Sequence, residues 1–468
     1  MGMTEEEMDT LVEKKLLEKK AEIVKALMGF NANPSAKTFK DAENIPDRLL
    51  GEAMDAVMSE VAARKAEDVK IQNPAKKKLR YQGIRQTVIQ LKHGAYVTVR
   101  TAYYLPVKTP RRGRRRKVGR RGAAGAGVYP FLLLSGVIGG ASPALCEAVA
   151  LECLRDSYEE ATNALLLRGL DISTKRVRTI NVALGRVALA ARERRLANLE
   201  VTSEAEGKRL AVAVDGGRVL IRTDNPGRKT AKGRHTYKAE WREPKLFIIY
   251  ELDSEGRKKR RGTVRCDGTI GGPEQIFRLL AAELKSMNAK DAKSIIFLGD
   301  GAKWIWNRVD KLAEEIGIDK ERVTKCLDYY HAVEHLARIA EAKSFSSQKE
   351  RKQWLDNMKR QLKKMSPELF LAELGKSRRR GNAVIRREYI YFKTNLAAIN
   401  YAALLKNKLP IGSGAIESAV RRVVNLRIKA AGTFWKLENA EAALHLRCQL
   451  KSGNWNSFYE NLLNTLAA

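Results

Sequence analysis

The stretch RLAVAVDGGRVLIRTD, residues 209–224, marks the point at which the periodicity of the chain changes from helical to extended. Its density of Val, Leu and Ile predicts a β-strand. Two further strands are predicted at residues 244–256, PKLFIIYELDSEG, and at residues 262–268, GTVRCDG. Asp215 follows the apolar run of the first strand and precedes two glycines. We therefore expect a carboxylate at the end of this strand, with small neighbours that leave room for a close approach.

Helices and strands alternate after the third strand. Apolar periodicity predicts helices at residues 273–287, 304–316 and 330–342, and strands at 294–302, SIIFLGDGA, and 322–327. The resulting order βββαβαβα is that of a ribonuclease-H-like sheet with helices on both faces. Asp300 ends the fourth of these strands, which lies beside the first strand in such a sheet.

The fold class predicted for the whole chain is multidomain α+β. Residues 344–408 are lysine-rich and helical by period, which indicates an all-α insertion, and IGSGAIESAVRRVVNLRIKAAG after Pro410 predicts a helix that carries Glu417 and ends near Gly432. The predicted parts are a helical segment at 1–70, a basic hairpin and flexible Arg-rich arm at 71–127, a helical region at 128–205, the first part of the core at 206–343, the insertion at 344–408, and the completion of the core at 409–468.

The charge of the chain indicates a polyanionic partner. There are 88 Lys and Arg against 54 Asp and Glu, a formal net charge of +34, which far exceeds what solubility requires. Residues 71–121 hold 16 bases and no acid, so the excess is local. DNA is the expected partner of this mostly helical N-terminal region. A solvated run or a localisation signal is the less favoured interpretation of the run at 111–127.

The DNA-binding candidates lie in this basic region and on two helices. Residues 169–187 combine a short turn, a Ser173 N-cap and a basic helix, a pattern typical of the second half of a helix-turn-helix but also of an ordinary surface helix. The candidates are Lys76, Lys77, Lys78, Arg111, Arg112, Arg114, Arg115, Arg116, Arg176, Arg178, Arg421 and Arg427.

The remaining features predict a cytoplasmic protein. The N-terminus MGMTEEEMDT is acidic and lacks the pattern of a signal peptide, and the longest apolar stretch, residues 128–141, is shorter than a membrane crossing needs. Five cysteines without a CxxC pair predict buried free thiols instead of disulfides or a zinc finger.

Three acids are the candidate catalytic residues and metal ligands. Cleaving a phosphodiester with Mg²⁺ or Mn²⁺ needs carboxylates that converge on two ions about 4 Å apart. Asp215 and Asp300 end strands that neighbour each other in a ribonuclease-H-like sheet, and Glu417 lies in the first turn of a later helix. Singly, an acid before glycines is usually a turn residue, and a Glu at a helix start is usually a dipole partner. Their joint placement favours the catalytic interpretation.

Four segments in this order resemble a known family. VAVDGGR (212–218), FLGDGAKWIW (297–306), LDYYHAVEHL (327–336), and LPIGSGAIESA followed by RIKAAGTFW (409–435) are similar to the Kra-type (ISKra) family of prokaryotic insertion-sequence transposases, relatives of the Mutator-like DDE transposases. The resemblance covers roughly residue 81 to the C-terminus and is sharpest after Arg209.

This resemblance implies a DNA transposase that cleaves transposon ends and transfers strands into target DNA. Asp215, Asp300 and Glu417 would be its DDE residues holding two Mg²⁺ or Mn²⁺ ions, and Asp328 with His331 fits the family's aspartate, two residues, histidine signature. The implied partners are terminal inverted repeats, target DNA and further copies of the chain in a homodimer or higher oligomer, within the prokaryotic nucleoid. The chain departs from some relatives in lacking a cysteine-rich zinc-binding segment near the N-terminus.

Three competing interpretations remain at this point. A DNA-binding descendant could keep the fold and have lost catalysis. His331, Glu334 and His335 match the HxxEH pattern of zinc hydrolases, although that chemistry explains neither the charge nor the three acids. A tyrosine or serine recombinase is disfavoured, because no cluster of Arg and His surrounds Tyr329 and Tyr330.

Overall fold

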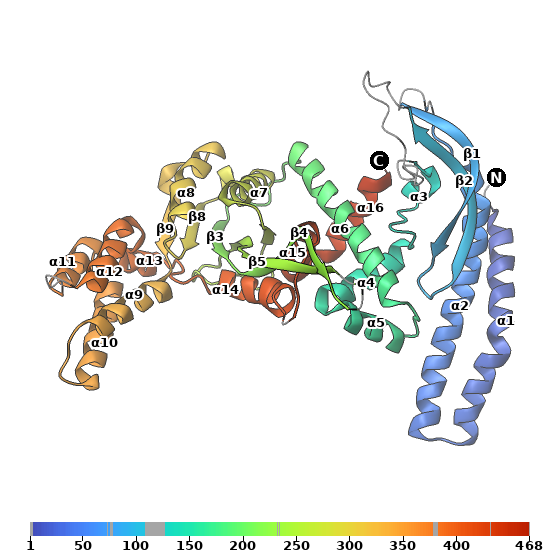
Figure 1. Cartoon of the computed structure of the whole chain (residues 1–468), viewed down its shortest axis with the longest axis horizontal. Coiled ribbons are helices and arrows are strands. Elements are labelled where there is room, and N and C mark those ends of the chain that lie inside the picture. Colours follow the sequence, from blue (N-terminus) through green and yellow to red (C-terminus); the bar gives the residue numbers. More distant parts are fainter. Residues whose placement is uncertain are drawn as a thin grey trace. The chain divides into compact units, whose positions relative to one another are not determined.

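The computed structural model describes residues 3–72, 74, 78–107, 127–231, 233, 235–377, 382–430 and 432–467. Its fold is mixed α+β, and the strands of the described residues form three separate sheets (Figure 1). The chain divides into two compact units, one of Met1–Val187 with Asn456–Ala468 and one of Ala188–Trp455. The expected multidomain α+β organisation is confirmed at this level.

The first unit combines long helices with one β-hairpin. α1 (Glu5–Ala32) packs against α2 (Ala36–Asp68), and α2 packs against β2 of the antiparallel hairpin β1 (Leu79–Gln90) and β2 (Tyr96–Pro106). The buried Asp55 carboxylate of α2 accepts backbone hydrogen bonds from His93 at 3.0 Å and Ala95 at 3.2 Å, which fixes the hairpin turn on the helix. A hairpin, as predicted for the basic region, is therefore present at residues 79–106.

Shorter helices complete the first unit. They are α3 (Pro130–Leu134), α4 (Pro143–Arg155), α5 (Tyr158–Leu167), the first part of α6 (Thr174–Ala197) and α16 (Trp455–Ala467). Ser173 accepts a hydrogen bond from the backbone N–H of Arg176 at 3.3 Å, so the predicted N-cap at the start of α6 is confirmed. The Arg-rich arm lies outside the described residues.

A five-stranded sheet forms the centre of the second unit. Its strands stand in the order β7-β6-β3-β8-β9, with β6 antiparallel to both β3 and β7, and β8 parallel to both β3 and β9. The strands are β3 (Arg209–Gly216), β6 (Lys245–Glu251), β7 (Val264–Thr269), β8 (Ser294–Gly299) and β9 (Val323–Leu327). β3, the first of these five strands along the chain, is thus the middle strand of the sheet.

Helices cover both faces of this sheet. Leu210, Val212 and Val214 of β3 are buried with α7 (Pro273–Ser286) and α8 (Lys303–Glu315). The alternate residues Ala211 and Ala213 are buried on the opposite face, with α9 (Tyr329–Ala342), α14 (Gly414–Val420) and α15 (Leu437–Ser452). Since side chains alternate along a strand, Asp215 belongs to the face of α9 and α14.

The first predicted strand was too long. It ends at Gly216, and the rest of the stretch forms β4 (Val219–Lys229), which pairs with β5 (His235–Arg242) in a separate antiparallel hairpin. The backbone N–H of Gly217 donates to Pro244 O at 2.8 Å, which closes the base of this hairpin. The polar sequence HTYKAEWR of β5 has no apolar alternation, so it gave no strand prediction.

The predicted insertion is all-α in the described residues between 344 and 408. It contains α10 (Gln348–Lys364), α11 (Pro367–Gly375), α12 (Ala383–Thr394) and α13 (Tyr401–Lys406). These orange helices gather beside α9, outside the sheet (Figure 1). Met358, Phe370 and Phe392 nevertheless belong to the same buried cluster as the sheet residues, so the insertion extends the core instead of forming a second one.

The expected state of the cysteines is confirmed, since Cys146, Cys153, Cys266, Cys326 and Cys448 are all buried free thiols. No described helix combines the length and the apolar character that crossing a membrane would require.

Candidate active site

A row of carboxylates lies where three parallel strands end. Ala213 of β3 is opposite Leu298 of β8, and Gly299 of β8 is opposite Leu327 of β9. Continuing these registers places Asp215, Asp300 and Asp328 beside one another on three adjacent strands, which are spaced by about 4.8 Å. The two predicted aspartates therefore meet at one sheet edge, together with a third.

Glu417 reaches this edge from the helix that covers it. α14 packs on β3 and β6, and Glu417 lies in its first turn. A Cβ on Gly217 would meet the Val424 side chain at 3.3 Å, so this glycine admits the helix that continues α14. The close approach that Gly217 permits is therefore that of the helix carrying Glu417.

The electrostatic surroundings of Asp215 connect the predicted trio. Burial, together with the negative charges of Asp300 and Glu417, raises the pKa of Asp215 to about 6. A 2.7 Å hydrogen bond from the Gly216 N–H and the nearby His331 act in the opposite direction. Carboxylates that share one partly buried place repel each other, and a bound cation would relieve that repulsion.

The described residues contain a group of three side chains whose ligand atoms lie close enough to hold one metal ion, and this group differs from the predicted trio. It consists of Asp328, His331 and Glu417, with one ligand atom from each lying within 4.8 Å of the others. The buried Asp328 caps α9, since its Oδ1 accepts from the His331 N–H at 2.7 Å. Its Oδ2 accepts from the Ser413 N–H at 2.5 Å, and Ser413 Oγ donates to Glu417 at 3.3 Å. Asp328 thereby attaches the Glu417 segment to the sheet.

The insertion supports Asp300. The Tyr391 hydroxyl of α12 donates to Asp300 O at 2.8 Å, while Asp300 Oδ1 accepts from the Ala302 N–H at 2.9 Å. Burial, followed by the charge of Asp300, raises the pKa of Tyr391 well above its usual range, so the hydroxyl stays protonated and donates. Sequence reasoning missed Tyr391 and Ser413, because their roles arise only from contacts between distant segments.

Gly301 is expected to tolerate no side chain. Its φ is +90°, and a Cβ would lie 2.9 Å from both Leu327 and Tyr391. Gly301→Ala should therefore destabilise the second unit by about 2 kcal/mol or more and displace Asp300. Gly414→Ala is the matched control, since no atom lies within 4 Å of its Cβ position. Equal unfolding midpoints for the two variants in urea would contradict this expectation.

The predicted DNA-binding residues divide into exposed and engaged side chains. Lys78, Arg178 and Arg421 are exposed. The Arg176 guanidinium donates to Gln90, Gly139 and Gly140 at 2.6–3.0 Å, which gives it a structural role within the first unit. Arg427 is buried, with its guanidinium 5.1 Å from the centre of the Trp435 ring. Lys76, Lys77, Arg111, Arg112, Arg114, Arg115 and Arg116 lie outside the described residues.

The HxxEH residues do not form a zinc site in the described part of the chain. His331 belongs to the group with Asp328 and Glu417. His335 instead pairs through Nδ1 with the buried Glu388 of α12, and its ring stacks on Tyr391 with centroids 3.5 Å apart. One helix therefore directs its two histidines to different partners.

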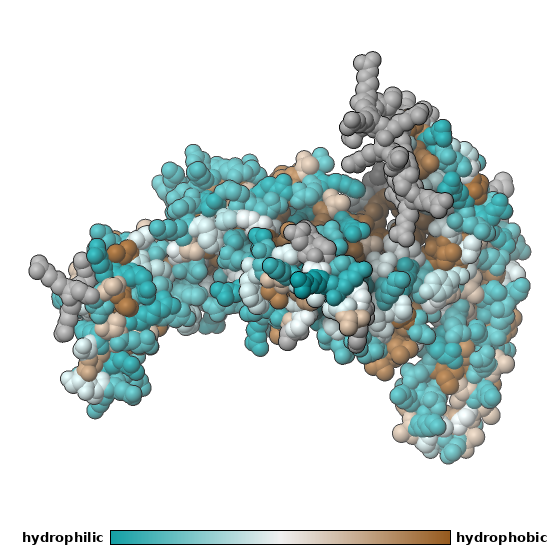
Figure 2. Space-filling view, in the orientation of Figure 1, coloured by the Kyte–Doolittle hydropathy of each residue, from teal (hydrophilic) through white to brown (hydrophobic). Residues whose placement is uncertain are grey.

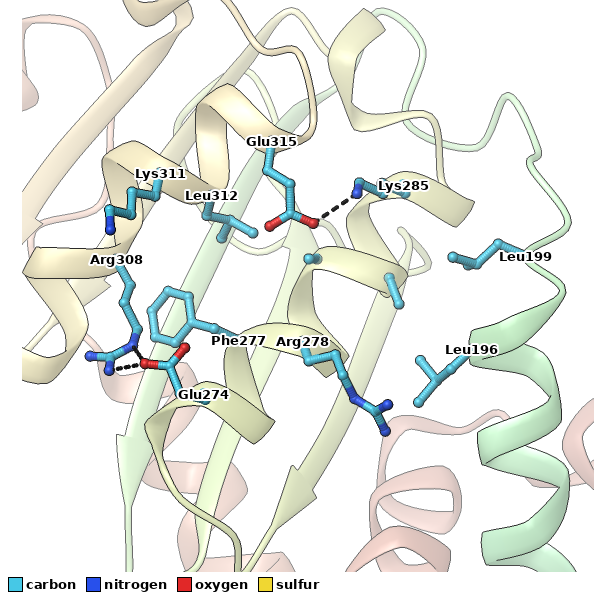
Figure 3. Close-up of a pocket in the computed structure, with 12 residues that line it drawn as sticks. Leu196, Leu199, Glu274, Phe277, Arg278, Lys285, Arg308, Lys311, Leu312 and Glu315 are labelled. Carbon is cyan, nitrogen blue, oxygen red and sulfur yellow. Dashed lines mark hydrogen bonds and ion pairs between the residues drawn. The ribbon is translucent and has the colours of Figure 1, made fainter.

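A pocket of about 390 Å³ opens on the other face of the sheet, between α7, α8 and the end of α6. Phe277 and Leu312 lie between its charged side chains (Figure 3). Arg308 pairs with Glu274, and Lys285 pairs with Glu315 at 2.8 Å. Because these charges neutralise each other in pairs, the pocket lacks the converging acids of the strand-end site.

Comparison of the chain with protein-family models found no match, and comparison with curated proteins found no similar sequence. The functional assignment therefore depends on the side-chain arrangement at the sheet edge and on the charge of the chain.

Proposed function

We propose that this protein is a metal-dependent DNA transposase of the Kra type, with a ribonuclease-H-like core in its second unit. The observation that carries the proposal is the meeting of Asp215 and Asp300 at adjacent strand ends with Glu417 above them. The strand order β7-β6-β3-β8-β9 supports it. In this sheet β3, β6 and β7 are antiparallel neighbours, and β8 and β9 are added on the other side of β3, parallel to it.

The residues present suit Mg²⁺ or Mn²⁺. Asp215, Asp300 and Glu417 would hold two ions, since such ions prefer carboxylate oxygens, and the crowded acids of the site favour added positive charge. When bound, the ions polarise the scissile phosphate and activate the attacking oxygen.

The protein's own groups position this chemistry. Asp328 holds the Ser413 segment and so the start of the Glu417 helix, and Tyr391 holds the backbone at Asp300. The half-buried His331 stands beside Asp328 and Glu417, where its imidazole can donate a hydrogen bond to a phosphate oxygen.

DNA is the proposed partner. The net charge of +34 favours a phosphate backbone, and terminal inverted repeats and target DNA would both pass the sheet edge. Pairing two DNA ends for strand transfer requires a homodimer or a higher oligomer.

The decisive experiment is cleavage of DNA that flanks the gene. The purified protein should cut at terminal inverted repeats in Mg²⁺ or Mn²⁺ and should be inactive in EDTA. Supercoiled plasmid without these flanks serves as the substrate control. Cleavage that persists in EDTA would refute a metal-dependent transposase. The same conclusion would follow if the protein binds the flanks but cuts them with neither ion.

A further inference from the structure

The β4–β5 hairpin leaves the five-stranded sheet at the edge that carries the acids. β4 begins at Val219, shortly after Asp215, and β5 ends at Arg242, just before β6 begins. Both ends of the hairpin are therefore at the sheet edge where the candidate active site lies.

The base of the hairpin is fixed to the core. Val219 and Ile221 are buried in the cluster that includes Val423 and Val424. The backbone of Trp435 accepts a hydrogen bond from the Arg222 N–H at 2.8 Å and donates one to Leu220 O at 3.0 Å. Trp435 Nε1 in turn donates to Ile428 O at 2.9 Å, at the end of the π-helical segment η4 (Arg421–Ile428) that continues α14. The hairpin base is thus tied to the segments that carry Asp215 and Glu417.

The hairpin presents basic and aromatic side chains from its base to its far end. Residues 219–242 contain seven Lys and Arg against two acids. Trp241 is 58% exposed, and the Arg222 guanidinium lies 4.0 Å from the centre of the Tyr237 ring. The surface over β4 and β5 is mainly hydrophilic (Figure 2).

These side chains lack an evident structural role. Arg228, Lys229 and Lys238 are exposed, and no acid among the described residues is paired with them, whereas Arg242 pairs with Glu240 at 2.5 Å. A folded core gains nothing from three unneutralised cations along the hairpin or from an exposed Trp near its base. A polyanion with stacking bases would complement both features.

We propose that the β4–β5 hairpin is a DNA-binding arm beside the cleavage site. Arg228, Lys229 and Lys238 contact the phosphate backbone, and Trp241 stacks on a base that is unpaired near the cut. This inference rests on the proposed function, since the DNA must enter the acid-lined edge.

Binding is measured on the full chain in EDTA, so that cleavage plays no part. Replacing Arg228, Lys229 and Lys238 with Ala should flatten the slope of log K against log salt by up to about 3 units, at roughly 0.9 for each phosphate contact. The control variant replaces Lys290, Lys293 and Lys320 with Ala, which removes the same charge near the starts of β8 and β9, at the opposite sheet edge. The control variant should flatten the slope of log K against log salt less than the hairpin variant does.

Trp241→Ala tests the stacking. It should weaken binding to a short duplex with one unpaired end by about 5-fold or more, with a smaller effect on the blunt duplex, and Trp241→Phe should restore most of the loss. Because Trp241 is exposed, these variants should unfold like the wild type.

Three outcomes would overturn the inference. The first is an equal slope for the hairpin and control variants, and the second is unchanged binding of both duplexes by Trp241→Ala. The third is weaker self-association of the hairpin variants with DNA affinity intact, which would assign the surface to a second copy of the chain. If the hairpin variant binds DNA more weakly but the wild type never cleaves, the DNA-binding arm is supported and the transposase function is not. If the wild type cleaves and the hairpin variant binds DNA normally, the transposase function is supported and the arm is not.

Discussion

Asp215→Asn, Asp300→Asn and Glu417→Gln are each expected to lower the rate of metal-dependent DNA cleavage by about 100-fold or more, with DNA affinity largely retained. Each substitution keeps the shape of the side chain but removes a charge that would hold an ion where the phosphate reacts. Cleavage rates and binding constants are measured on the same DNA.

Glu321→Gln is the matched control for these variants, because Glu321 is exposed before β9, at the opposite edge of the sheet. It should cleave at the wild-type rate. A variant of the trio that cleaves at nearly the wild-type rate would remove that residue from the catalytic set.

The same cluster predicts how the metal-free protein responds to pH. The pKa of Asp215 is raised in the folded state to about 6 from an ordinary value of 3.8, first by burial and then by the neighbouring acids. The stability that the folded state gains by holding this proton is therefore complete below about pH 4 and is lost as the pH rises through 6. Asp215→Asn should remove this loss, so the variant should be more stable than the wild type at pH 8 without metal.

Fluorescence can follow mainly the second unit, because five of the six tryptophans of the chain lie inside it and the sixth, Trp455, is its last residue. Urea midpoints are compared at pH 5 and pH 8 for the wild type and for Asp215→Asn. If both proteins show the same change between the two pH values, another group causes it and the crowding of acids at Asp215 is refuted.

Asp328→Ala is expected to destabilise the second unit by about 3 kcal/mol. It removes the cap of α9, a loss of about 1 kcal/mol, and leaves the buried N–H of Ser413 without its acceptor, which costs about 1–3 kcal/mol. The freed Ser413 segment should also misplace Glu417 and reduce cleavage. The measurements are the urea midpoint and the cleavage rate.

Asp328→Asn separates positioning from metal binding. Asn keeps the shape of the side chain and one acceptor oxygen, so it should keep one of the two backbone hydrogen bonds, lose less stability than Asp328→Ala and retain much of the Mn²⁺ affinity. If Asp328→Asn loses Mn²⁺ affinity as fully as Asp300→Asn in calorimetric titrations, Asp328 is itself a ligand and the positioning role is wrong.

The sequence predicted the sheet elements well, because buried strands carry a local signal. The apolar runs around Val212, Phe247 and Phe297 each became a strand with its core-facing residues buried, and the acids after two of them are at strand ends. The all-α character of the insertion was equally local, since it follows from helical periodicity alone.

The features that were missed depend on contacts between distant residues or on weak local patterns. β5 is polar on both faces, so nothing in its sequence distinguishes it from a loop. Arg176 and Arg427 looked like surface bases, but one is engaged by backbone carbonyls and the other is buried beside Trp435. Periodicity cannot show which partner a long side chain will find.

The hydrogen bond between Asp328 and Ser413 spans 85 positions of the chain, and Tyr329 N–H donates to Ile411 O at 2.9 Å beside it. The insertion is therefore a long loop with both ends clamped together. The entropy of closing such a loop grows only with the logarithm of its length, by about 0.6 kcal/mol for each doubling. Chain length could thus be added between these helices over evolution at little entropic cost, provided that the clamp, Tyr391 and the buried Met358, Phe370 and Phe392 are kept, while the third acid keeps its place.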